Sequence, residues 1–62
     1  MNLRLLIECE FINDETTVIV RDDELRIFAK GNWYLDTVLA FMSARISSFT
    51  WQNDNQVYIN LE

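Results

Sequence analysis

Few side chains in this sequence are suited to acid–base or nucleophilic chemistry. The chain has no His, one cysteine and one lysine, so a general base or nucleophile must come from carboxylates, Cys9, Lys30 or tyrosine. Cys9 falls on the inward side of an expected strand, where a buried thiol is inert. Lys30 stands at a strand end with no acidic motif around it. We therefore expect no catalytic residue and a protein that is not an enzyme.

The spacing of possible ligands gives little support for a metal or cofactor site. Asp22, Asp23 and Glu24 are adjacent carboxylates, but they lack the alternating oxygen ligands and the glycine of a calcium loop. Gly31 is the only glycine, which excludes a glycine-rich phosphate loop. A single cysteine leaves no disulfide or two-Cys metal site within the chain. We expect no metal and no cofactor.

The acidic residues carry the strongest compositional signal. Ten Asp and Glu oppose five Lys and Arg, which gives a formal net charge of -5. Nucleic-acid-binding proteins gain most of their affinity from Lys and Arg that neutralise phosphates, and these are few and scattered here. We therefore expect no direct contact with nucleic acid. The same negative field favours a partner protein with a basic surface, including surfaces that normally hold DNA or RNA.

The apolar runs are too short for a membrane segment. The longest covers five residues, 38–42, against the roughly 20 residues that span a bilayer. Glu8 and Glu10 interrupt the apolar core that a secretory signal would need. We expect a cytoplasmic protein that does not cross or bind a membrane.

Apolar and polar residues alternate over residues 3–12, which predicts a half-buried strand. A turn follows, and the β-branched run over 16–21 predicts a second strand. The acidic turn at 22–24 leads to a third alternating segment over 25–30. These segments predict strands joined by tight turns.

The pattern changes after Asn32, which is a suitable helix N-cap. An apolar stripe at helical spacing then predicts one long helix that ends near Phe49. The stripe consists of Leu35, Val38, Leu39, Met42, Ile46 and Phe49. A polar loop over 52–56 precedes a last alternating segment, 57–62, which predicts a fourth strand.

Residues 1–62 are therefore predicted to form a single α+β domain. The expected architecture is a two-layer sandwich in which one helix covers one face of a mainly antiparallel four-stranded sheet, in the order βββαβ. We place the last strand beside the first. A domain of this size has a small core, so it should gain stability from a partner that adds burial.

Some apolar side chains are predicted to remain on the sheet face without a helix or beside the helical stripe. An apolar cluster rimmed by charge indicates an interface, and a homodimer is the simplest one. The alternative is that scattered apolar residues on a wet face have no partner, and that Phe41 widens the core. Trp33 and Trp51 either pack over the ends of the sandwich or stack on a ligand. The residues assigned to self-association or partner binding are Leu6, Ile19, Phe28, Tyr58, Tyr34 and Phe41.

The acidic residues gather in turns and along the first predicted strand, where Glu8 and Glu10 point outward about 6.7 Å apart. Such an array imitates the charges of a nucleic-acid backbone and would fit a groove lined by Arg and Lys. The alternative is that these charges only keep a small domain soluble. The residues assigned to the acidic surface are Glu8, Glu10, Asp14, Glu15, Asp22, Asp23 and Glu24, and Asp54 lies in a further turn.

A very short, acidic, His-free α+β domain without catalytic residues resembles the small bacteriophage proteins that block host defence, notably anti-CRISPR inhibitors. The resemblance covers the general character of the chain and no motif. It implies a protein in the host cytoplasm that binds a CRISPR effector subunit and covers its nucleic-acid-binding groove through the acidic residues.

Two other functions are compatible with the sequence. An antitoxin or immunity-type protein that neutralises a basic toxin would use the same electrostatic attraction. A dimeric structural module would instead use the open sheet face. Salt separates these classes, because charge-driven association slows with added salt while apolar pairing barely responds.

Overall fold

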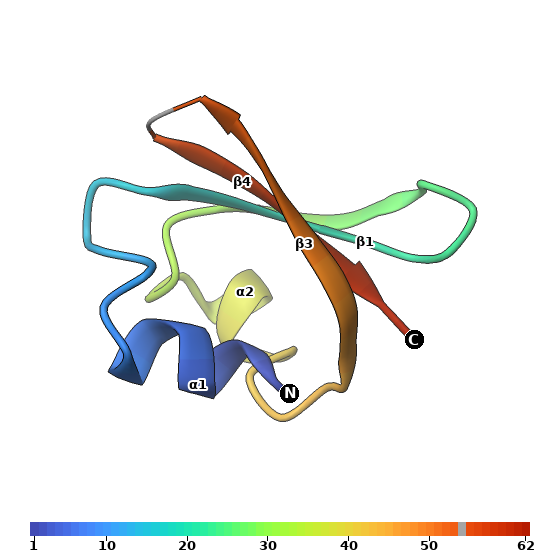
Figure 1. Cartoon of the computed structure of the whole chain (residues 1–62), viewed down its shortest axis with the longest axis horizontal. Coiled ribbons are helices and arrows are strands. Elements are labelled where there is room, and N and C mark those ends of the chain that lie inside the picture. The colour runs from blue at the N-terminus through green and yellow to red at the C-terminus, as the bar shows by residue number, and fades with distance from the viewer. Residues whose placement is uncertain (54) are drawn as a thin grey trace.

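The computed structural model describes residues 1–53 and 55–62. Over these residues the elements follow the order α1 (Leu3–Glu8), β1 (Thr17–Arg21), β2 (Ile27–Gly31), α2 (Asp36–Leu39), β3 (Ile46–Asn53) and β4 (Gln56–Leu61). The strands form one mixed four-stranded sheet, and both helices lie on the same side of it (Figure 1). The prediction of a small α+β domain with a four-stranded sheet is confirmed. The predicted order and the single helix match only in part.

A parallel pair of strands occupies the centre of the sheet, whose strand order is β2-β1-β4-β3. β1 and β4 run parallel, while β2 and β3 are antiparallel edge strands. Val18 lies opposite Val57 and Val20 lies opposite Ile59, and each of these side chains is at most 1% exposed. The last strand was predicted beside residues 3–12. It lies beside β1 instead, because the first segment is a helix.

The predicted strand over residues 3–12 is wrong, since residues 3–8 form α1. The apolar residues of this segment satisfy both an alternating and a helical period, because Leu3 and Leu6 are one turn apart. A cap decides between the two: the Asn2 side chain accepts a hydrogen bond from the Leu5 amide at 3.1 Å. Leu and Arg also favour a helix over a strand. Leu3 and Leu6 are consequently buried beneath the sheet.

The predicted long helix is also wrong beyond its first turn. α2 ends at Leu39, and the stripe residues Ile46 and Phe49 belong to β3. The pairing of β3 with β4 shifts between Ile46 and Ser48, which marks a β-bulge at Ser47. The extra residue places Ile46 and Phe49 on the same face of the strand although they are three residues apart. Because of the bulge, two inward-facing residues of this strand have the spacing that is typical of a helix.

The core fills the space between the sheet and the two helices (Figure 1). α1 contributes Leu3 and Leu6, and the short α2 contributes Val38, which is fully buried. The hydrophobic cluster comprises Leu3, Leu6, Ile12, Val18, Val20, Ala29, Val38, Ile46, Val57 and Ile59. Burying such side chains stabilises the fold by roughly 1.5–3 kcal/mol each before the cost of ordering the chain.

A polar network crosses the sheet face opposite the helices. The Arg21 guanidinium lies 4.0 Å from the centre of the Tyr58 ring, and its Nε donates to Asn60 Oδ1 at 2.9 Å. Asn60 Nδ2 in turn donates to Ser48 Oγ at 3.0 Å. Three strands are thus joined by side chains as well as by their backbones. This network links the side chains of the uncovered face, which has no layer of helices over it.

The only glycine closes β2 in a conformation that suits no other residue. Gly31 has φ +148°, and a Cβ built there would lie 2.3 Å from Leu35 Cδ1. We expect Gly31→Ala to lower the free energy of unfolding by about 1–3 kcal/mol because of the strained backbone. Urea denaturation followed by circular dichroism measures the change.

The double variant Gly31→Ala/Leu35→Ala separates the two causes. Removing the Leu35 side chain relieves the contact and leaves φ unchanged, so most of the added loss from Gly31→Ala should persist in a Leu35→Ala background. If that loss vanishes, the contact with Leu35 is responsible, and the backbone explanation is wrong.

Candidate functional site

The structure divides the predicted acidic surface between two ends of the sheet. Glu10, Asp14 and Glu15 lie in the connection between α1 and β1, whereas Asp22, Asp23 and Glu24 form the turn between β1 and β2. β1 has 5 residues, so its ends are about 13 Å apart at roughly 3.3 Å per residue. Figure 1 shows the two connections at opposite ends of the molecule. This separation exceeds the Debye length of about 8 Å at physiological ionic strength.

Glu8 and Glu10 do not form the predicted pair on one strand. Glu8 ends α1, and Glu10 follows it in the turn. Glu8 lines a hollow of about 330 Å³ between α1 and the segment around α2, together with Arg4, Ile7, Trp33, Leu39 and Met42. Glu10 lines a different hollow with the following loop. The spacing of 6.7 Å predicted for these carboxylates along a strand is therefore wrong.

Glu10 is held in a left-handed conformation by the end of α1. Its φ is 64°, and its amide donates to the Ile7 carbonyl at 3.0 Å while the Phe11 amide donates to the Leu6 carbonyl at 3.0 Å. This is a Schellman motif, in which glycine is the usual residue at the left-handed position. A glutamate there costs conformational energy, yet it brings a carboxylate to the start of the loop.

The loop continues as a turn built on Asn13. Asn13 Oδ1 accepts from the Glu15 amide at 2.8 Å, and the Thr16 amide donates to the Asn13 carbonyl at 3.1 Å. Thr16 is 1% exposed, and its hydroxyl donates to Asn13 Oδ1 at 3.2 Å. These bonds hold the backbone of Asp14 and Glu15 in one turn and leave both side chains exposed.

The segment after β2 fixes the loop from the side. Trp33 Nε1 donates to Asp14 Oδ1 at 2.9 Å, and Asn32 Nδ2 donates to the Asp14 carbonyl at 2.6 Å. Trp33 packs against the core, so it ties the loop to the body of the domain. The sequence suggested Asn32 as a helix cap, but α2 has Leu35 at its N-cap, and Asn32 supports the loop instead.

Residues 10–15, the acidic loop, surround an open hollow of about 590 Å³ lined by Glu10, Ile12, Asn13, Asp14 and Glu15. In the part of the chain that the structure describes, the ion pairs involve other carboxylates, and none includes Glu10, Asp14 or Glu15. The acidic loop thus presents uncompensated negative charge on a fixed backbone. Such a preorganised anionic surface can accept hydrogen bonds from Arg and Lys side chains of a partner.

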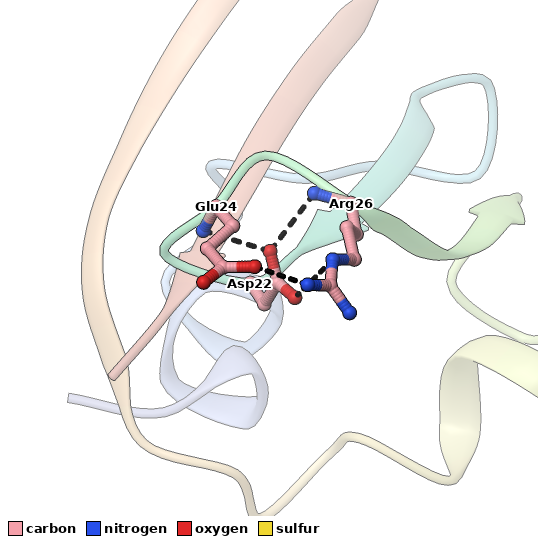
Figure 2. A network of polar contacts seen from close by, with 3 residues as sticks. All are labelled: Asp22, Glu24 and Arg26. Atoms are coloured by element: carbon pink, nitrogen blue, oxygen red, sulfur yellow. Dashed lines mark hydrogen bonds and ion pairs between the residues drawn. The ribbon is translucent and has the colours of Figure 1, made fainter.

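The turn between β1 and β2 uses two of its three carboxylates, those of Asp22 and Glu24, internally. Asp22 Oδ1 accepts from the Glu24 and Arg26 amides at 2.8 Å each. The Arg26 guanidinium pairs with Glu24 and also lies 3.9 Å from Asp22 Oδ2 (Figure 2). Exposed pairs of this kind contribute little stability, but they cancel local charge. This turn is therefore a less suitable contact for a basic partner than the acidic loop.

The predicted apolar surface is not one surface in the structure. Leu6 is in the core, because α1 replaced the predicted strand, and Ile19 is buried in the sheet. Phe28 sits at a β-bulge in β2, where the pairing shifts between Val20 and Arg21, and its ring stacks on Phe41 with centroids 5.8 Å apart. Tyr58 lies beneath Arg21, and Tyr34 packs edge-on against Trp33. Among the residues predicted for this surface, Phe28 and Phe41 form an aromatic pair with each other.

Sequence reasoning missed residues that act through tertiary contacts. Trp33 and Asn32 hold the acidic loop although they lie eighteen or nineteen positions away. A turn after residue 12 was expected, but nothing in the sequence indicated which segment would pack beside it. Cys9 was expected to be buried and is exposed, because it caps α1 instead of facing inward from a strand.

Among the described residues, no group of three or more His, Cys, Asp or Glu side chains is arranged to hold a metal ion. No helix in the same part of the chain is long and apolar enough to cross a membrane. Comparison with known proteins finds no matching family model, curated protein or solved structure.

Replacing Glu10 by glycine tests the strain in the acidic loop. We expect Glu10→Gly to raise the free energy of unfolding by about 1 kcal/mol, because glycine adopts positive φ without steric cost. Thermal and urea denaturation measure the change.

Glu10→Gln is the matched control, since it removes the charge and keeps the side chain. Its stability should stay near that of the original protein. If Glu10→Gln stabilises as much as Glu10→Gly, charge repulsion within the loop is the cause and the backbone explanation fails.

Proposed function

We propose that this protein is a small non-enzymatic inhibitor that binds a basic surface of a host protein through the acidic loop. The bound surface is a groove that otherwise holds nucleic acid, as in the anti-CRISPR proteins that the chain resembles in general character. The protein would act in the cytoplasm of the host cell. Its partner in this proposal is a CRISPR effector subunit.

The observation that carries the proposal is the unpaired charge of the acidic loop. Glu10, Asp14 and Glu15 line one hollow and have no ion-pair partner among the described residues. A loop that existed only for solubility would not need its backbone held by Asn13, Asn32 and Trp33. Fixing the carboxylates before binding lowers the entropy that association must overcome.

The position of the loop also supports this function. The acidic loop projects from one end of the sheet, beside the helices (Figure 1). It can therefore enter a groove without moving β1 or β4. Blocking a groove requires only occupancy and repulsion of phosphates, which a negatively charged domain supplies without any catalytic residue.

A charge-neutral loop tests the proposal directly. The variant Glu10→Gln/Asp14→Asn/Glu15→Gln removes three charges, changing the formal net charge from -5 to -2, and keeps the Asp14 position able to accept from Trp33. We expect it to lose binding to a purified CRISPR effector and to restore target-DNA binding by that effector. A DNA-binding assay at low and moderate salt measures both, because charge-driven association weakens with salt.

The matched control is Asp23→Asn/Glu24→Gln/Glu62→Gln, which also changes the net charge from -5 to -2 but leaves the acidic loop intact. It should still inhibit. Equal loss in both variants would show that net charge alone acts. If the original protein inhibits no effector but the same loop-dependent capture is seen with a basic toxin, the protein is an antitoxin and not an anti-CRISPR inhibitor.

A further inference from the structure

One edge of the sheet is long, exposed and free of charge. β3 spans Ile46–Asn53, has 8 residues and lies at the edge of the described sheet beside β4, so beyond its first residue the backbone groups of its other side face outward. Its sequence ISSFTWQN contains no Asp, Glu, Lys or Arg. Natural edge strands are protected by charges or proline, and the opposite edge strand, β2, carries Lys30. β3 has neither charge nor proline, and its protection consists of two β-bulges.

The beginning of β3 is covered by the N-terminus. The Ile46 amide donates to the Met1 carbonyl at 2.9 Å, and Asn2 forms an isolated bridge with Arg45. Beyond Ile46 no further segment is paired with this edge in the described residues. The bulges at Ser47 and Gln52 leave a regular stretch over 48–51 between them. This stretch is the part of the edge that can pair with another strand.

Aromatic side chains lie along the free stretch on the side of the helices. Trp51 is 39% exposed, and Phe49 is partly buried. Phe11, which is 56% exposed, packs against Phe49 with ring centroids 6.3 Å apart. Aromatic pairs opposite each other on neighbouring strands stabilise a sheet by roughly 0.2–1 kcal/mol each. An antiparallel neighbour with aromatic residues at matching positions would cover this patch.

A second copy of the chain offers those positions. In antiparallel pairing, directly opposite residues lie on the same face, so the two-fold axis between the strands must lie where one residue faces its own copy. An axis at Thr50 places Phe49 of each copy opposite Trp51 of the other and keeps the contact away from the covered start of β3. An axis at Phe49 would give one aromatic pair instead of two. It would also move the contact toward the start of β3, which the N-terminus covers.

We infer that two copies of this protein associate through their β3 edges, antiparallel and centred on Thr50, and join their sheets into one. The absence of charge on β3 makes this possible in a chain of net charge -5, because no like charges meet at the contact. The surface differs from the apolar faces predicted from the sequence. It shares Phe11 with the acidic loop but none of the carboxylates proposed to bind a partner, so the inference goes beyond the proposed function and does not depend on it.

Disulfide trapping tests the register. Directly opposite residues in an antiparallel pair have Cα atoms about 4.5–5.5 Å apart, within the range for a disulfide. We expect Cys9→Ser/Thr50→Cys to form a covalent dimer under mild oxidation roughly tenfold faster or more than Cys9→Ser/Thr37→Cys, whose cysteine is exposed on α2. Equal rates would overturn the proposed contact.

Charge substitution tests the association without a covalent bond. Thr50→Lys places two like charges opposite each other and should raise the dimer dissociation constant about fivefold in sedimentation equilibrium, as should Thr50→Glu. Mixing the two variants should restore a heterodimer, whereas Thr37→Lys should behave like the original protein. A monomeric original protein at every concentration, or no recovery in the mixture, would overturn the inference.

Discussion

The parallel pair formed by β1 and β4 brings Val18, Val20, Val57 and Ile59 together at the centre of the sheet, where these side chains are almost completely buried. Both helices cover this pair from one side. Parallel strands need coverage and a long connection, and here the intervening β2, α2 and β3 provide the connection. β2 pairs with β1 and β3 pairs with β4, so the positions of both edge strands depend on this buried pair.

The bulges decide which residues meet. In β3 the extra residue at Ser47 places Ile46 and Phe49 on the core side, and in β2 the shift beside Val20 brings Phe28 onto Phe41. Each bulge also interrupts the regular ladder of an edge strand, which limits unwanted pairing. The stretch of β3 between its two bulges remains regular and uncharged, and that is where another copy can pair.

The charged residues are arranged differently in the two connections that flank β1. In the turn between β1 and β2, Arg26 pairs with Asp22 and Glu24, whereas the acidic loop is fixed by neutral donors from Asn32 and Trp33. In a chain of net charge -5, the acidic loop is thus the end where none of the carboxylates has an ion-pair partner among the described residues. The two proposed contacts, the carboxylates of the acidic loop and the β3 edge, involve different residues and adjoin where Phe11 packs against Phe49, so a dimer would present two acidic loops at once.

The sequence alone determined the class of the domain and three of its strands in part. The β-branched run of β1, the acidic turn after it and the alternation of β4 each favour one structure strongly, because no other period fits them. The same sequence failed where two periods fit equally well. Residues 3–8 alternate and also place Leu3 and Leu6 one helical turn apart, and the Asn2 cap selected the helix.

The tertiary structure alone decided the rest. Ile46 and Phe49 have helical spacing in a segment that pairs with β4, and only that pairing creates the bulge that accommodates them. The acidic residues were recognisable by type, but their grouping depended on which ends of β1 they occupied and on Trp33, far along the chain. The local sequence pattern limits the kinds of interaction that a residue can make. Long-range packing decides which residues become its partners.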